Sequence, residues 1–249
     1  MARIRLEEID TRAPKGLEKQ DTKKKTEDLL KELDDLQNLL YAESKHSILV
    51  VLQGMDASGK DGVIRNAFGH MNPQGVNVSS FKAPTTEELA HDFLWRIHQH
   101  APAKGMIQVF NRSHYEDILI TRVHKWCDDK MARKRMQAIN DFERLLENNN
   151  THILKFYLHV SYEEQQERLK ERLSDPQKMW KYNAKDFEEA KFRDQYREAY
   201  EECFENCNNP PWTMVPADQN WYKEYIIVSA LHSLLTGLDM KYPILEKNK

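Results

Sequence analysis

The sequence is organised around one short stretch, Gly54-Met55-Asp56-Ala57-Ser58-Gly59-Lys60-Asp61-Gly62. Its G-x-x-x-x-G-K spacing is that of a phosphate-binding loop, and the pattern is informative where a strand precedes it and a helix follows. The preceding residues, Ser47–Gln53, are mostly apolar and β-branched, which is typical of a strand buried on both faces. A helix is predicted from Lys60 to about Gly69. The stretch therefore predicts a phosphate loop between a buried strand and a helix.

The residue types in this stretch suit a chain of phosphates. Glycine at positions 54 and 59 lets the backbone form a nest of N–H groups, and the positive end of the next helix adds to it. Lys60 supplies a positive charge to the next phosphate oxygens. The residues expected to bind phosphate here are Gly54, Met55, Ala57, Ser58, Gly59, Lys60 and Asp61. The alternative interpretation is an ordinary glycine turn between a strand and a helix.

Two carboxylates in the stretch predict a metal ion. Loops of this pattern commonly have Ser or Thr after the lysine to bind Mg²⁺, but here Asp61 stands there, and Asp56 lies inside the loop. Two acids beside a polyanion would repel it unless a divalent cation lies between them. We therefore expect Asp56 and Asp61 to hold Mg²⁺, with Mn²⁺ as a substitute. The alternative for Asp61 is an acid that only complements the dipole of the following helix.

A second buried strand, residues 106–110, precedes another polar segment, Asn111-Arg112-Ser113-His114-Tyr115-Glu116-Asp117. In phosphoryl-transfer enzymes of this build, the strand beside the phosphate loop delivers an acid for the metal at its C-terminal end. That position is the neutral Asn111, so the acidic role falls on Glu116 or Asp117, and Asp117 is a predicted metal ligand. Both acids could instead cap the following helix.

A mixed-charge segment, about residues 161–197, predicts a helical lid. Its helical pattern breaks at Asp175-Pro176, and lysines alternate with aromatic residues after the break. A mobile segment that closes on phosphates needs cations, because closure must neutralise charge while it excludes water. The alternative is a solvated helix held by salt-bridge pairs.

Cations outside the loop are candidates to bind the phosphate chain or to stabilise the transferred group. For the transferred group the candidates are Arg112, Arg122, Arg168 and Arg172. For binding the chain they are Lys82, Lys178 and Lys181. A further basic cluster within residues 122–135 would extend a cationic track or be ordinary surface.

Strand and helix patterns alternate along the chain, which predicts an α/β fold with a parallel sheet flanked by helices. The predicted strands are residues 47–53, 76–81, 106–110, 152–160 and 213–216. The predicted helices lie within residues 29–44, 60–69, 85–97, 128–148, 161–207 and 221–235. We expect a single domain over residues 1–249, with residues 1–18 as a loosely held N-terminal arm.

Composition excludes several classes of protein. The 249 residues carry 37 Lys and Arg against 40 Asp and Glu, a net charge of −3, which argues against a nucleic-acid binder that depends on cationic excess. No apolar run is long enough to span a membrane, and the start of the chain has no secretory signal pattern. Three cysteines cannot form a closed disulfide framework, so we expect a cytoplasmic protein.

Several of these stretches together resemble the polyphosphate kinase 2 family. They are the phosphate loop at residues 54–62, Asn72-Pro73-Gln74-Gly75-Val76, Phe110-Asn111-Arg112-Ser113-His114-Tyr115-Glu116-Asp117, and Trp180-Lys181-Tyr182. The likeness covers about residues 20–240 in the family's order. It implies a P-loop kinase fold related to thymidylate kinase, a helical lid, Mg²⁺, and phosphoryl transfer between inorganic polyphosphate and nucleotides.

The pair formed by Asn111 and Glu116 implies a subgroup. Many family members have Asp at the first position and Asn at the second, and the pairing here resembles the class III subgroup, which phosphorylates both AMP and ADP. Glu116 would then help to accommodate or activate the phosphate of the nucleotide. The resemblance implies reversible transfer that yields ADP and ATP, with guanine nucleotides as further substrates and a homo-oligomer, dimer or tetramer, as the assembly.

Three other functions are weighed against this one. An ATP-dependent nucleoside monophosphate kinase shares the loop, the lid and the fold, and differs in its phosphate donor. A nucleotide-dependent switch is disfavoured because the chain lacks an Asn-Lys-x-Asp motif that would read the base. An RNA-binding protein is disfavoured by the net charge of −3.

Overall fold

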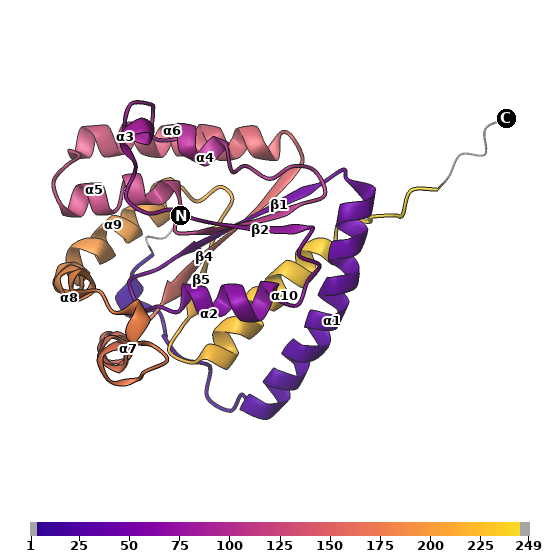
Figure 1. The fold of residues 1–249 in the computed structure, drawn as a ribbon, viewed down its shortest axis with the longest axis horizontal. Coiled ribbons are helices and arrows are strands. Elements are labelled where there is room, and N and C mark those ends of the chain that lie inside the picture. The colour runs from indigo at the N-terminus through magenta and orange to yellow at the C-terminus, as the bar shows by residue number, and fades with distance from the viewer. Residues whose placement is uncertain (1–3, 245–249) are drawn as a thin grey trace.

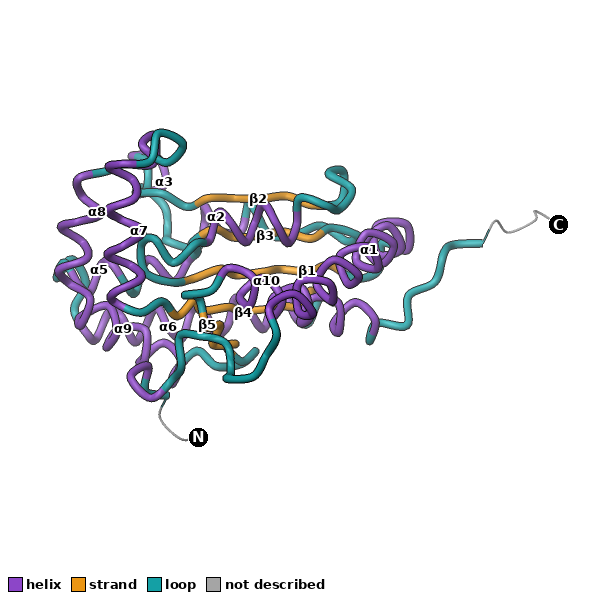
Figure 2. Tube along the Cα trace, turned by 90° about the horizontal axis from the view of Figure 1, so that it is seen from below, coloured by secondary structure: helices purple, strands orange, loops and turns teal. Residues whose placement is uncertain are grey.

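The computed structural model describes residues 4–244, and its centre is a parallel sheet with strand order β2-β3-β1-β4-β5. The strands are β1 (Ser47–Gln53), β2 (Val76–Ser80), β3 (Ile107–Asn111), β4 (Thr151–His159) and β5 (Trp212–Pro216). They lie side by side in this order in Figure 2. The predicted strands and the α/β fold class are confirmed.

Strand β1 is the middle of the sheet and is buried along its whole length. It pairs in parallel with β3 on one side and with β4 on the other, so that Val50 lies opposite Val109 and Leu154. A strand with neighbours on both edges and helices on both faces must be apolar throughout, which explains its sequence. Because the strands are parallel, their carboxyl ends meet at one edge of the sheet, where the loop after β1 lies.

One face of the sheet is covered by α1 (Lys19–Glu43), α2 (Lys60–Val63) and α10 (Asn220–Thr236) (Figure 1). Leu33 of α1 and Leu231 of α10 are buried in the same core as Val50. Helix α2 continues as a π-helical turn over Ile64–Phe68, so the helix predicted from Lys60 is present. Within residues 4–244, none of the helices combines the length and the apolar character that crossing a bilayer requires.

The opposite face is covered by α4 (Trp95–His98), α6 (Asp129–Glu147) and α9 (Arg193–Asn206), with α5 (Ile120–Val123) beside them (Figure 1). Ile139 of α6 and Phe204 of α9 pack with Phe110 of β3 and Tyr157 of β4 in a second core. The two cores, one on each face, fix the sheet and therefore the edge at which the strands end.

The helix predicted over residues 85–97 is not continuous. Thr85 caps α3 (Thr86–Leu89) with a full capping box to Glu88, but α3 ends after one turn and Leu89 is exposed. The side chain of Asp92 then accepts a hydrogen bond from the N–H of Leu94 (3.0 Å). This local turn interrupts the helical hydrogen bonding before α4 begins.

The lid segment, residues 161–197, stands beyond the carboxyl ends of the strands (Figures 1 and 2). It contains α7 (Tyr162–Ser174), a 3-10 turn at Met179–Lys181, α8 (Ala184–Glu189) and a second 3-10 turn at Ala190–Phe192, after which α9 begins. The single break predicted at Asp175-Pro176 is therefore the first of several changes of direction. Residues 161–197 thus form a compact lobe over the sheet edge instead of one long helix.

The expectation of a loosely held N-terminal arm is wrong for residues 4 to 13. Leu6 is only 2% exposed and belongs to the core beside α9, and its N–H donates to Glu201 (2.8 Å). Thr11 donates to Asp218 (2.8 Å), and the N–H of Ala13 donates to Gln219 (2.9 Å). One buried apolar side chain and three hydrogen bonds thus fix a segment whose regular structure is a single 3-10 turn, Leu6–Glu8.

Two leucines of this arm give a stability test. Leu6→Ala should lower the free energy of unfolding by about 3 kcal/mol, because it removes a fully buried side chain and leaves a cavity. Leu17→Ala is the matched control: Leu17 is 38% exposed, and its truncation should change stability by about 0.5 kcal/mol or less. Equilibrium urea unfolding measures both, and equal effects would show that the arm is not anchored.

Candidate active site

The phosphate loop lies between β1 and α2, and its backbone has the conformation that its glycines predict. Gly54 has φ +152° and Gly59 φ +96°, both in the region that favours glycine, and Ala57 between them has φ +62°. A methyl group on Gly54 would lie 2.9 Å from the carbonyl oxygen of Leu158 in β4. The loop therefore curls tightly against the sheet edge, and glycine is required for that approach.

Lys60 is folded back onto the loop. It is 9% exposed, and its Nζ donates to the carbonyl oxygen of Gly54 (2.7 Å) and more weakly to that of Met55 (3.3 Å). Burial, together with the positive charge of Arg112, lowers its pKa to about 8. A bound phosphate would replace the carbonyl partners with an anion and stabilise the ammonium form.

Arg112 holds the acids at the centre of the site together. Its φ of +63° is unusual for a residue with a side chain, and its N–H donates to the carbonyl oxygen of Leu52 (3.1 Å). The guanidinium contacts Asp56 (Nη2–Oδ1 2.6 Å) and lies near Glu116 (Nη1–Oε2 3.8 Å). The negative charges of Glu116 and Asp56 raise the pKa of Arg112, although its burial opposes them.

Glu116 and Asp61 have opposite electrostatic environments. Burial raises the pKa of Glu116 despite the positive charges of Arg112 and Lys60. Burial acts in the same direction on Asp61, but hydrogen bonds from Lys181 (2.8 Å) and Asn111 (3.0 Å) outweigh it and lower its pKa. Glu116 therefore holds a proton more readily than Asp61, which stays ionised.

The two predicted lid arginines lie on α7 and contact different groups. Arg168 donates to the carbonyl oxygens of Ala57 (3.1 Å) and Ser58 (3.0 Å) in the phosphate loop, and its other amino group bonds the backbone of Ala217 and Asp218. Arg172 is paired with Asp186 of α8. Arg168 therefore holds the loop itself, whereas Arg172 is held inside the lid segment.

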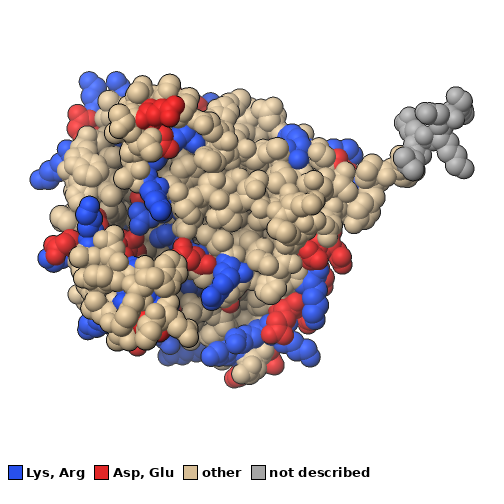
Figure 3. Space-filling model, viewed as in Figure 1, with Lys and Arg blue, Asp and Glu red and all other residues tan. Residues whose placement is uncertain are grey.

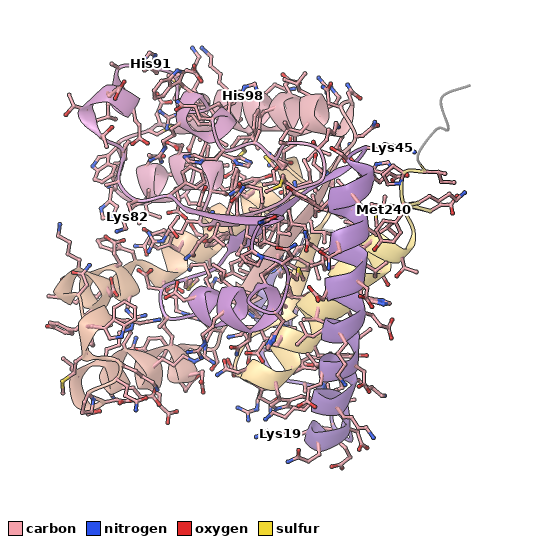
Figure 4. The ribbon with its side chains drawn as sticks, turned by 45° about the vertical axis from the view of Figure 1, so that its right-hand side comes forward. Lys19, Lys45, Lys82, His91, His98 and Met240 are labelled. Carbon is pink, nitrogen blue, oxygen red and sulfur yellow. The ribbon has the colours of Figure 1, made fainter. Side chains whose placement is uncertain are left out.

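A cleft between the loop, the ends of β2 and β3 and the lid segment brings together most of the predicted site residues. Those that line it are Asp56, Ala57, Ser58, Gly59, Lys60, Asp61, Lys82, Arg112, Arg168, Arg172, Lys178 and Lys181. Figure 3 shows basic side chains around a hollow beside the α7–α8 lobe, with acidic ones between them. Lys82 lies above the lid helices at the left of Figure 4. The cleft is therefore cationic on several sides.

A second, smaller hollow lies on the other side of the Asp56–Arg112 pair. Five residues of the loop and of the segment after β3 line it: Gly54, Met55, Asp56, Arg112 and Glu116. The rest of its lining comes from α7 and the region of α8 and α9: Gln165, Glu189, Ala190, Arg193, Tyr196 and Tyr200. Because Asp56 and Arg112 line both hollows, they stand at the boundary between two neighbouring binding volumes.

Two predicted residues, Arg122 and Asp117, lie outside both the cleft and the smaller hollow. Arg122 is paired with Asp129 (2.9 Å) and Glu202 (2.6 Å), away from the phosphate loop. Asp117 lies 3.5 Å from Arg96, and burial raises its pKa. The geometry therefore does not support a role for Arg122 at the transferred group or for Asp117 as a metal ligand.

The basic cluster within residues 122–135 does not extend the cationic cleft. Helix α9 places acidic side chains against it, and the groove between them is lined by Glu198, Glu201, Glu202 and Glu205 as well as by Arg122, Lys125 and Arg133. Acidic side chains outnumber basic ones along this groove, whereas basic ones outnumber acidic ones in the cleft, so the groove does not suit a polyanion. These acids were not expected beside the basic cluster, because they lie about 70 residues after it in the chain.

Several residues at the site were not found from the sequence. Gln53 is buried at the end of β1 and donates to Ser113 (3.0 Å), while Tyr200 donates to Gln53 (3.1 Å). Lys223 is buried beneath the loop and donates to the carbonyl oxygen of Ser58 (3.3 Å). The helical spacing could have predicted the burial of Lys223, because this residue lies four positions before Ile227 on the face of α10 that packs on the sheet.

The residues of the cleft fit a magnesium ion that arrives with its phosphates. Mg²⁺ is commonly held by one or two carboxylates together with phosphate oxygens and water. Asp56 and Asp61 offer two such carboxylates on the loop. Within the described part of the chain, no group of three or more His, Cys, Asp or Glu side chains forms a self-contained metal site. Two carboxylates would suit an ion that also binds phosphate oxygens of the substrate.

Comparison with known proteins gives consistent results. The family model described as polyphosphate kinase 2 matches residues 16–244. The AMP/ADP-polyphosphate phosphotransferase of Meiothermus ruber is 46% identical over 217 residues, which cover 86% of this chain and 81% of that protein. The ADP-polyphosphate phosphotransferase of Rhodopseudomonas palustris is 41% identical over 225 residues, which cover 85% of this chain and 78% of that protein.

A solved structure is similar over almost the whole chain. The crystal structure of polyphosphate kinase 2 from Arthrobacter aurescens TC1 superposes with a TM-score of 0.95 at 40% sequence identity. The superposition covers 99% of this chain and 90% of that one. The sheet, the phosphate loop and the lid segment therefore belong to one shared architecture.

Two glycines of the loop give a matched test of its geometry. Gly59→Ala should weaken the binding of inorganic tripolyphosphate by roughly ten-fold, because a side chain at φ +96° is strained by about 1–3 kcal/mol and would collide with the Lys223 ammonium. Gly62→Ala should keep full binding, since a methyl group there meets no atom within 4 Å and alanine favours the helix. Titration calorimetry measures both, and a Gly59→Ala protein that binds normally would contradict the described loop.

Proposed function

The chain belongs to the polyphosphate kinase 2 family, and from this membership and the geometry of the cleft we propose that it transfers phosphoryl groups from inorganic polyphosphate to nucleotides. The proposed acceptors are AMP, which gives ADP, and ADP, which gives ATP, and the transfer is reversible. The name of the relative from Meiothermus ruber includes both acceptors, AMP and ADP. One observation carries the proposal: a phosphate loop opens into a cleft with cations well beyond the loop.

The spread of these cations suits a donor made of many phosphates. Lys60 lies in the loop, Lys82 follows β2, and Lys178 and Lys181 come from the lid segment, yet all line the same cleft. A chain with one negative charge at each phosphate gains from separated positive charges along its path, whereas a single phosphate group needs only the loop. The lid segment already places these two lysines on the cleft, and its further closure would exclude water from the reacting groups.

The boundary between the two hollows is the natural place for transfer. Phosphoryl transfer depends on position and charge and requires no covalent intermediate on the protein. We assign the polyphosphate end to the loop and the phosphate of the acceptor to the smaller hollow. Arg112 lines both volumes, so its guanidinium can contact the phosphoryl group as it passes from one to the other.

Glu116 gives the smaller hollow a carboxyl group suited to a phosphate acceptor. Its pKa is raised by burial, so it keeps a proton more readily than an exposed glutamate. A protonated carboxyl donates a hydrogen bond to a phosphate oxygen, whereas an ionised one repels it. This is the physical basis for proposing that Glu116 accommodates AMP, as the class III subgroup would require.

The proposed metal is Mg²⁺, with Mn²⁺ as a substitute, held by Asp56 and Asp61. When bound, the ion would neutralise charge on the phosphate oxygens. To release these carboxylates for the metal, Arg112 and Lys181 must turn from their present partners toward phosphate. Guanine nucleotides as substrates, a dimeric or tetrameric assembly and a cytoplasmic location stay predictions.

The donor separates this function from that of an ATP-dependent nucleotide kinase. Purified protein with AMP, Mg²⁺ and long-chain polyphosphate as the sole donor should form ADP and then ATP. Lys60→Ala should reduce that rate by ~10²-fold, which corresponds to ~3 kcal/mol of transition-state stabilisation. Lys45→Ala, an exposed lysine outside the cleft, is the control and should retain full activity. Product formation only with ATP as the donor would refute the proposal.

Two adjacent acids test the acceptor assignment. Glu116→Asn should reduce phosphorylation of AMP by roughly ten-fold relative to that of ADP, because the smaller hollow loses the carboxyl group that faces the acceptor. Asp117→Asn should leave the ratio of the two rates unchanged, since Asp117 faces Arg96 outside both hollows. The ratio is measured from initial rates with each acceptor. An equal loss on both acceptors in Glu116→Asn would contradict this role.

A further inference from the structure

Lys223 is a buried cation for which the described structure shows no carboxylate partner. It lies in the first turn of α10, is 1% exposed, and donates to the side-chain oxygen of Asn220 (2.9 Å) and the carbonyl oxygen of Ser58 (3.3 Å). A buried charge is costly unless something compensates it, so its position beneath the phosphate loop requires an explanation.

The geometry of the phosphate loop explains why Lys223 is buried there. The carbonyl oxygen of Ser58 accepts hydrogen bonds from both Lys223 and Arg168, and that of Ala57 accepts a further one from Arg168. In a planar trans peptide the C=O and the following N–H point in opposite directions. Carbonyls that face these two cations therefore leave the N–H of Gly59 directed to the other side, where an anion would bind.

We propose that Lys223 is a positioning residue of this enzyme, which with Arg168 holds the outer carbonyls of the phosphate loop, and that it gains a proton when polyphosphate fills the loop. The inference rests on the proposed function, because it requires polyphosphate to bind at this loop. It assigns to Lys223 no contact with the substrate. The lysine acts on the substrate through the backbone of Ser58 and Gly59.

The charges around Lys223 support a change of protonation on binding. Burial and the neighbouring cations Arg168 and Lys60 lower its pKa to about 7, while the acids Glu224 and Glu164 raise it less. A polyanion on the far side of the loop would add negative charge and raise the pKa. Between the two pKa values the complex binds more protons than the free protein, so binding takes up protons and weakens as the pH rises.

Proton uptake can be measured directly. Binding of long-chain polyphosphate is followed by calorimetry near pH 7.5 in two buffers with different ionisation enthalpies, and the difference gives the number of protons exchanged. The native protein should take up protons. Lys223→Met should take up about 0.7 fewer per site, because a lysine with a pKa of about 7 is largely neutral at that pH before binding. Its affinity should be about ten-fold lower.

Controls separate this role from a merely structural one. Lys223→Met removes a buried charge and should not lower thermal stability at pH 7. Lys223→Gln is the second variant and should show the same loss of proton uptake, while Lys45→Gln should bind like the native protein. If the native protein binds without proton uptake, or if both Lys223 variants keep it, this inference is wrong although the proposed function stands. If the native protein does not bind polyphosphate at all, both are refuted.

Discussion

A cleft that binds a polyanion must first balance its own positive charge, and this constraint shapes the described site. Arg112 contacts Asp56, Lys181 contacts Asp61, and Arg172 is paired with Asp186. Lys60 is buried against carbonyl oxygens instead. Each cation therefore has an internal partner that a phosphate could replace. Binding then exchanges the internal partners of these four cations for phosphate oxygens, so that none of them is left without a partner in a low-dielectric site.

Replacing an internal partner by phosphate costs a different amount of free energy on the two walls of the cleft. The Lys181–Asp61 pair joins the lid segment to the loop, and Asp61 is well exposed, so the pair contributes about 0–1 kcal/mol. It can open at little cost when phosphate or metal takes its place. The opposite wall is more rigid: Arg112 lies in an unusual backbone conformation, directly after β3, and the next three side chains, Ser113, His114 and Tyr115, are fully buried. The lid segment can therefore move while the backbone that carries Arg112 stays fixed and only its guanidinium turns toward phosphate.

The sequence predicted those features that depend on local pattern. An apolar strand followed by glycines and a lysine defines both the sheet and the loop, and the two aspartates of the loop lie where they were expected. The sequence did not predict which of Glu116 and Asp117 faces the site. Both lie in a 3-10 turn, His114–Asp117, whose orientation is set by tertiary contacts. One acid faces Arg112 and the other Arg96. The acids of α9 that neutralise the basic cluster were missed for the same reason.

The contacts that orient this turn lie beneath it and explain why Glu116 can be buried at all. Glu143 accepts hydrogen bonds from Lys155 (2.7 Å) and from the hydroxyl of Tyr115 (2.9 Å), and it lies 3.2 Å from His114. This network is wholly buried and joins β4, α6 and the turn. Because these bonds tie the turn to α6 and β4, the turn has one orientation, and the carboxyl of Glu116 within it is held in a poorly hydrated place. Burial raises the pKa of that carboxyl, and the role proposed for it toward a phosphate acceptor rests on this environment. The chemistry proposed for the smaller hollow thus depends on a buried polar network that touches no substrate.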